Sequence, residues 1–184
     1  LIIHKAVAAD FLAAFEARAA KVKVGDPLDD ATKVGAIITP EHLKKIENAV
    51  ADASADGAAV AIGGAGLASG AGQYMAPTVV TGVKPEMAIA RDEVFGPVLS
   101  VMEFERVEEA IRLVDTTDYG LSAGVWSKDI DTAVTVARAA RAGTVWVNTF
   151  MDGYPELPFG GMKQSGLGRE LGKGAVEDFT EQKT

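Results

Sequence analysis

The chain contains 184 residues, of which 48% are hydrophobic and 24% are charged, and its formal net charge is −8. This length is enough for one domain with a sizeable core. The negative charge and the lack of a Lys/Arg-rich run argue against a nucleic-acid partner, because nucleic-acid binding requires a basic face that neutralises phosphates. No apolar run approaches the length of a membrane span, so we expect no membrane partner. Because no signal peptide is recognisable, we expect a cytoplasmic protein.

The sequence contains no cysteine and only two histidines, at positions 4 and 42. It therefore offers no disulfide, no thiolate metal ligand and no thiol nucleophile. Two histidines far apart in the sequence do not make a metal site, so we expect none.

The N-terminal region is predicted to form a strand followed by a helix. Residues 1–4 are typical of a buried strand and lack an initiator methionine, so we expect this chain to be a piece of a longer one. Apolar residues recur at helical spacing over residues 7–23. The tripeptide Gly25-Asp26-Pro27 is expected to end this helix.

A second helix and a short strand precede a glycine-rich run. Pro40, with Thr39 as N-cap, begins the helix, and a buried strand is predicted at residues 58–62. The glycines of residues 63–70 have GxGxxxG spacing, and no helix is expected after them. A dinucleotide-binding fingerprint requires a following helix whose N-terminal amides meet the pyrophosphate. We therefore interpret this run as a surface connection that leads to a strand at residues 78–81.

Residues 90–98 combine charged side chains, one phenylalanine and a Gly-Pro pair. Gly96 must be extended before Pro97, because the proline ring disfavours a helical residue ahead of it. The resulting bend leads into a predicted strand over residues 98–104. A carboxylate and an aromatic ring at the start of a buried strand suit a polar aromatic ligand. The alternative is a solvated acidic turn with one core phenylalanine.

The second half of the chain alternates strands and helices. Besides residues 98–104, strands are predicted at 121–126 and 144–148, and helices at 107–114 and 130–142. This alternation implies parallel pairing through right-handed crossovers, and hence an α/β fold with an open, mostly parallel sheet and flanking helices. Ligands in such folds lie outside the carboxyl ends of the strands. Here those ends are the loops after Trp126 and Asn148.

The long loop at residues 149–170 carries three aromatic residues and several glycines. Aromatic walls with a few polar groups suit a small-molecule pocket, and glycines allow close backbone approach. The alternative is a packed, irregular loop that caps the sheet edge. A short helix at 175–179 and an extended arm at 181–184 are predicted to follow.

Four motifs now identify a resemblance that runs in order over nearly the whole chain. They are Glu93-Val94-Phe95-Gly96-Pro97, Tyr119-Gly120-Leu121, Ala142-Gly143-Thr144-Val145-Trp146-Val147-Asn148 and Pro158-Phe159-Gly160-Gly161-Met162-Lys163-Gln164-Ser165-Gly166. Together they resemble the C-terminal part of an NAD(P)-dependent aldehyde dehydrogenase. In that family a cysteine thiolate attacks the aldehyde, a hydride passes to the nicotinamide, and water hydrolyses the thioester.

The resemblance implies a division of the chain and an incomplete catalytic apparatus. Residues 1–180 would be part of the catalytic domain, beginning just after the cysteine nucleophile, and residues 181–184 would begin an oligomerisation arm. The family's cysteine, its general-base glutamate and the glycine turn of its cofactor domain would all lie upstream. We therefore expect the isolated chain to be inactive. Its expected partners are an aldehyde, the missing N-terminal portion of its own polypeptide, and further copies in a homodimer or homotetramer.

The resemblance also implies a cofactor site for NAD or NADP. Glu93 resembles the glutamate that accepts hydrogen bonds from the nicotinamide ribose, and its two carboxylate oxygens suit a vicinal diol. Phe95 resembles the ring that packs near the nicotinamide. Lys45 and His42 fall where the family's second helix reaches the cofactor ribose. His42 replaces a common glutamine, and the alternative for Lys45 is a solvated surface lysine.

Residues of the long loop are implied to form the substrate pocket. Phe159 resembles a wall of the substrate tunnel, Phe150 and Tyr154 would be further walls, and Thr149 would line the tunnel base. Glu170 resembles a glutamate that relays protons away from the general base. The alternative for Glu170 is an ion pair with its neighbouring arginine, or a cap for the next segment.

The substrate and two other functions remain open at this point. Asp152, Glu156, Phe150 and Tyr154 would attract a cationic aldehyde, by charge and by cation–π attraction worth about 0.5–2 kcal/mol. This favours a betaine or amino aldehyde. The alternatives are a non-catalytic nucleotide-binding module and an oligomerisation fragment.

Overall fold

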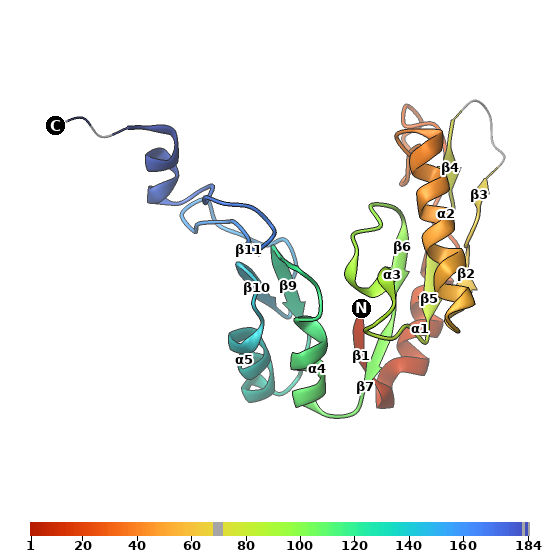
Figure 1. Ribbon diagram of the computed structural model, residues 1–184, viewed down its shortest axis with the longest axis horizontal. Helices are drawn as coiled ribbons and strands as arrows, with labels where there is room; N and C mark the ends of the chain where they lie inside the picture. The colour runs from red at the N-terminus through yellow and green to blue at the C-terminus, as the bar shows by residue number, and fades with distance from the viewer. Residues whose placement is uncertain (68–71, 182, 184) are drawn as a thin grey trace. The chain divides into compact units, whose positions relative to one another are not determined.

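The computed structural model describes residues 1–67, 72–181 and 183. These residues divide into two compact units, Leu1–Glu105 and Arg106–Thr184. Each unit contains both strands and helices, as Figure 1 shows.

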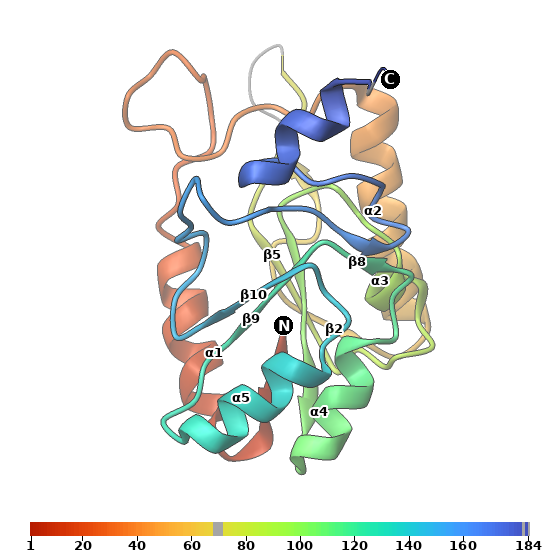
Figure 2. The same cartoon turned by 90° about the vertical axis from the view of Figure 1, so that its left-hand side faces the viewer.

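Two long helices, α1 (Lys5–Ala19) and α2 (Pro40–Ala55), lie on either side of the strands of the first unit (Figure 2). The hydroxyl of Thr39 accepts a hydrogen bond from the His42 amide at 3.1 Å, and Pro40 is the first helical residue of α2. This confirms the predicted N-cap, which satisfies one of the amides that a helix start leaves unpaired.

The strands of the first unit form small sheets. They are β1 (Ile2–His4), β2 (Ala59–Ile62), β3 (Gly66–Leu67), β4 (Tyr74–Met75), β5 (Thr78–Thr81), β6 (Val98–Ser100) and β7 (Met102–Phe104). Strand β5 lies between β2 and β6, pairing antiparallel with β2 and parallel with β6. Strand β1 pairs in parallel with β7, and β3 pairs antiparallel with β4.

Helix α1 and these strands enclose an apolar core. The buried residues Ile3, Ala8, Val79 and Val101 form one cluster, against which Leu12, Phe15, Ile62 and Leu99 pack. The buried face of α2 consists of Ile46, Val50 and Ala53. These residues belong to the apolar stripe expected of this amphipathic helix.

The second unit is built around one parallel strand pair. Its elements are α4 (Val107–Val114), β8 (Tyr119–Gly120), β9 (Ser122–Val125), α5 (Ile130–Ala139), β10 (Thr144–Val147), β11 (Met162–Lys163) and the 3₁₀ helix η1 (Lys173–Phe179). Strands β9 and β10 pair in parallel, and α5 connects them. Strand β8 pairs antiparallel with β11. The predicted α/β class, with mostly parallel pairing and flanking helices, is confirmed.

Several local predictions are corrected. Strand β2 was expected to be buried, but most of it is exposed, because it lies at the edge of its sheet, where β5 is its one neighbour among the described strands. The strand predicted at 98–104 is interrupted at Val101. The first helix ends at Ala19, since the amides of Lys21 and Val22 bond to carbonyls three residues earlier, which tightens and ends the last turn.

Other differences concern elements that were not predicted. A short helix, α3 (Ala88–Arg91), precedes the turn at 92–96. Residues 66–67 of the glycine-rich run form β3, whereas residues 68–70 lie outside the described residues. Of the arm expected at 181–184, residues 182 and 184 also lie outside them.

Candidate functional site

The turn at residues 92–96 presents a carboxylate and an aromatic ring to solvent. Glu93 is exposed, and within the described part of the chain its carboxylate has no hydrogen bond or ion pair. Phe95 is 73% exposed, so it is not a core phenylalanine. Its φ of 55° lies in the left-handed region that residues other than glycine rarely adopt. Such strain costs about 1–3 kcal/mol and persists only where the surroundings hold it.

Helix α2 holds this turn in place. Nε2 of His42 lies 2.9 Å from the carbonyl oxygen of Phe95, and the two rings meet edge to face with centroids 6.3 Å apart. Gly96 packs closely on the helix, because a Cβ at this position would lie 2.6 Å from Cδ1 of Ile46. Lys45 is exposed on the same helix. This exposure agrees with the alternative of a solvated surface lysine and also leaves the side chain accessible to a ligand.

These residues fit one end of a pyridine nucleotide. An exposed carboxylate without a partner has two free oxygens, which can accept both hydroxyls of a ribose diol. The exposed Phe95 ring, two residues away on a fixed turn, offers an apolar surface for a planar heterocycle. The structure therefore brings together His42 and the Glu93–Phe95 turn.

In the second unit, the side chain of Asn148 joins the loops at the carboxyl ends of β9 and β10 through hydrogen bonds. The Oδ1 atom of Asn148 accepts a hydrogen bond from the Ser127 amide at 2.9 Å, and its Nδ2 donates to the Ser127 carbonyl at 3.0 Å. Asn148 also has a positive φ of 56°. The chain thus turns sharply at the sheet edge where ligands of α/β folds bind.

Aromatic rings gather beside these strand ends. Phe150 lies edge to face against the buried Trp146, at 5.2 Å between ring centroids. Trp126 lies 6.5 Å from Phe150, and Phe159 lies 6.5 Å from Trp146, also between ring centroids. The Trp146 indole N–H donates to the Asp152 carbonyl at 2.8 Å, which ties the loop to the strand. Two predicted walls, Phe150 and Phe159, are therefore neighbours of one tryptophan.

The other predicted pocket residues are less closely grouped. Tyr154 is 67% exposed, Thr149 is partly buried at the strand end, and the structure records no aromatic contact of Tyr154 with the described residues. Trp126 was not predicted as a pocket wall, although its place at the end of β9 pointed to it. The indole of Trp146 was likewise read only as part of a strand.

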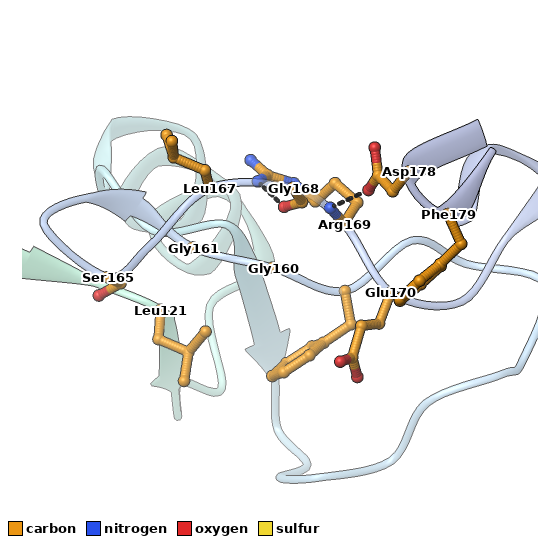
Figure 3. Close-up of a pocket in the computed structure, with 11 residues that line it drawn as sticks. Leu121, Gly160, Gly161, Ser165, Leu167, Gly168, Arg169, Glu170, Asp178 and Phe179 are labelled. Carbon is orange, nitrogen blue, oxygen red and sulfur yellow. Dashed lines mark hydrogen bonds between the residues drawn. The ribbon is translucent and has the colours of Figure 1, made fainter. Parts of the chain in front are cut away.

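Glu170 lies beside Phe159 in a pocket of about 570 Å³. The two residues form an isolated antiparallel bridge through amide–carbonyl hydrogen bonds of 2.7 and 2.8 Å. Figure 3 shows the Glu170 carboxylate and the Arg169 guanidinium pointing to different sides. Arg169 instead donates to the Gly168 carbonyl from its guanidinium and to Asp178 from its amide, so an ion pair with Glu170 is not formed.

Two residues of the last motif, Gly160 and Lys163, make close contacts that the sequence did not predict. A Cβ on Gly143 would lie 1.6 Å from the Gly160 carbonyl oxygen, so the two backbones touch directly. Lys163, with a side chain only 11% exposed, donates to the Thr117 carbonyl at 2.8 Å and lies 3.5 Å from Asp115. The glycine contact fixes the end of the long loop to the start of β10, and the Lys163 contacts fix it to the segment between α4 and β8.

Among the described residues, no three histidine, aspartate or glutamate side chains are grouped so that they could hold a metal ion. Within the same residues, no helix has the length and apolarity required to cross a membrane.

Comparisons with known proteins agree over the whole chain. The family model described as the aldehyde dehydrogenase family matches residues 1–184. A betaine aldehyde dehydrogenase of Rhizobium etli is 40% identical over all of this chain, and the chain spans 38% of that protein's length. A cytosolic aldehyde dehydrogenase 2 of Macroscelides proboscideus is 41% identical, and the chain spans 76% of its length.

Solved structures are similarly close. The crystal structure of an NAD-dependent aldehyde dehydrogenase from Sinorhizobium meliloti superposes with a TM-score of 0.94 at 42% identity, covering 98% of this chain and 36% of that one. A betaine aldehyde dehydrogenase from Staphylococcus aureus in complex with NAD+ gives a TM-score of 0.91 at 40% identity, covering 97% of this chain and 36% of that one. Fold, motifs and sequence identity therefore agree, and the chain belongs to the aldehyde dehydrogenase family.

Proposed function

We propose that this chain is part of an enzyme that oxidises an aldehyde to a carboxylic acid with NAD or NADP, and that its first unit holds the nicotinamide end of the cofactor. The observation that carries this proposal is the exposed carboxylate of Glu93, which has no partner among the described residues, beside the fixed ring of Phe95. When bound, the cofactor supplies the hydride acceptor. The covalent chemistry requires a thiolate, which these 184 residues do not contain.

The residues of the first unit are proposed to bind the cofactor and to orient its nicotinamide ring. Glu93 accepts hydrogen bonds from the two ribose hydroxyls, which fixes the sugar and the ring attached to it. Phe95 limits the mobility of that ring by packing against it. Lys45 is proposed to reach the cofactor ribose from α2.

The second unit is proposed to bind the aldehyde. Phe150, Phe159, Tyr154 and Thr149 are proposed to line the substrate tunnel, with the Trp146 cluster as its rigid support. Glu170 is proposed to relay protons. Its carboxylate is exposed and makes no ion pair with Arg169, which leaves it accessible to water.

A carboxylate exchange tests the cofactor role. Glu93→Gln keeps the shape of the side chain but removes its charge and one acceptor, so NAD should bind about tenfold more weakly to the full-length protein, as expected for a lost charge-assisted hydrogen bond. Asp92→Asn is the matched control, because it removes an equal charge one residue away. Isothermal titration with NAD measures both. Equal affinities for the two variants would refute the assignment.

The substrate is proposed to be a betaine or amino aldehyde. Phe150 and Tyr154 are exposed aromatic rings on the same loop as the exposed carboxylates Asp152 and Glu156, and this combination attracts cations. Comparison of kcat/KM for betaine aldehyde, aminobutyraldehyde and neutral aliphatic aldehydes tests it. A preference for the neutral series would exclude this substrate class.

Two further proposals concern the state of the chain. The 184-residue chain alone should produce no NADH from aldehyde and NAD, and any such production in a pure sample would contradict the proposed role of an external cysteine.

We also propose assembly into a homodimer or homotetramer, since large apolar side chains near the C-terminus, Leu167, Val176 and Phe179, are exposed. Analytical ultracentrifugation of the full-length protein tests assembly. The cytoplasmic location stays a prediction.

A further inference from the structure

We propose that His42 is a positioning residue that clasps the turn at 92–96 through the backbone, instead of contacting the nucleotide itself. The inference rests on the proposed function, because the turn matters only if Glu93 and Phe95 bind the cofactor. It changes the role that the family resemblance implied for position 42, where a histidine replaces a common glutamine.

The geometry of the contact defines what the imidazole does. A carbonyl oxygen can only accept a hydrogen bond, so Nε2 of His42, 2.9 Å from the Phe95 oxygen, must carry the proton. The Nε2 donor is therefore already used within the protein. The ring edge also contacts Phe95, with planes inclined by 78°. Backbone and ring of the same phenylalanine are thus held by one side chain.

The held residue is the one that is strained. Phe95 has a φ of 55°, and without a restraint its backbone would return to the broad, lower-energy regions with negative φ. The turn is fixed on its other side, where Gly96 packs on Ile46 and accepts a hydrogen bond from the Val98 amide at 2.7 Å. Relaxation would consequently be confined to the residues just before Gly96, which include Glu93.

His42 is itself held in place by helix α2. It lies in the first turn of α2, where its amide donates to the Thr39 hydroxyl at 3.1 Å. One turn further along, Ile46 is completely buried. The clasp therefore joins a fixed helix to a strained turn, so losing it should move the turn and leave the helix in place.

Three variants of the full-length protein separate the clasp from other effects. His42→Phe keeps a flat ring against Phe95 but has no donor, and His42→Gln restores an N–H donor at a similar reach. Lys44→Gln, on the same helix, is the control, since the exposed Lys44 has one ion pair among the described residues, with the half-buried Glu47 at 3.8 Å. Crystal structures without NAD and titrations with NAD are compared for all three.

We expect Phe95 to leave the left-handed region in His42→Phe and to keep it in the other two proteins. NAD should bind about fivefold more weakly to His42→Phe, as the loss of one neutral hydrogen bond implies, and within about twofold of wild type to the others. A His42→Phe structure with Phe95 unmoved would overturn the clasp, as would weakening by His42→Gln equal to that by His42→Phe. If the unmodified protein does not bind NAD, the proposed function fails, while the crystal structures still decide whether the clasp exists.

Discussion

Replacing Gly143 by alanine should strongly destabilise the second unit. An added Cβ would lie 1.6 Å from the Gly160 carbonyl oxygen and 2.8 Å from its carbon, and both are backbone atoms that cannot rotate away. To restore even a tight contact, the two segments would have to separate by about 1.4 Å. Insertion of a methyl group into a packed interior costs about 1–3 kcal/mol, and we expect the upper end because both partners are backbone.

The two tryptophans of the chain, Trp126 and Trp146, both lie in the second unit, so their fluorescence reports its unfolding in urea. With a slope of about 2 kcal/mol per molar urea, a loss of about 3 kcal/mol lowers the midpoint by about 1.5 M. Gly153→Ala is the control, because a Cβ there would meet no atom within 4 Å. A Gly143→Ala midpoint within about 0.3 M of that control would refute the close-contact argument.

Three further outcomes follow from individual contacts. Lys163→Met should lower the unfolding free energy by about 1–3 kcal/mol in the same urea assay, because it leaves the Thr117 carbonyl and Asp115 without their ammonium partner. Thr39→Ala should destabilise the first unit by about 1 kcal/mol by circular dichroism, and Thr39→Ser should not, because serine also caps. Hydrogen bonds, above all from the Thr132 hydroxyl, lower the pKa of Asp129. The ionised Asp129 therefore stabilises the fold above about pH 4, and this stabilisation is lost as the pH falls through the lowered pKa. Thr132→Val should reduce the loss, and an acid dependence of the urea midpoint equal to that of the wild type would contradict this expectation.

The sequence predicted well those features that depend on neighbouring residues. The N-cap Thr39, the helical stripe of α2 and the strands β5 and β10 follow from local spacing, and the structure confirms them. It predicted less well where pairing partners decide the outcome. The exposure of β2 depends on its place at a sheet edge, and its antiparallel pairing with β5 depends on a distant strand.

The same distinction holds for the candidate site. Residue type indicated only a carboxylate and a ring beside a Gly-Pro bend, which suit a polar aromatic ligand, and the family resemblance then pointed to Glu93 and Phe95. That Phe95 is exposed with a positive φ, and that His42 grips its carbonyl from 53 positions away, could not be read from spacing.

What the sequence by itself determined was the family, the alternation of strands and helices, and the residue types available for binding, because motifs and periodicity are carried by consecutive positions. Only the tertiary structure decided which of these residues touch. Gly160 of the last motif proved to lie where two backbones meet, and the largely covered side chain of Lys163 proved to bond to Thr117 and Asp115. Contacts of this kind join residues far apart along the chain, so close packing alone determines them.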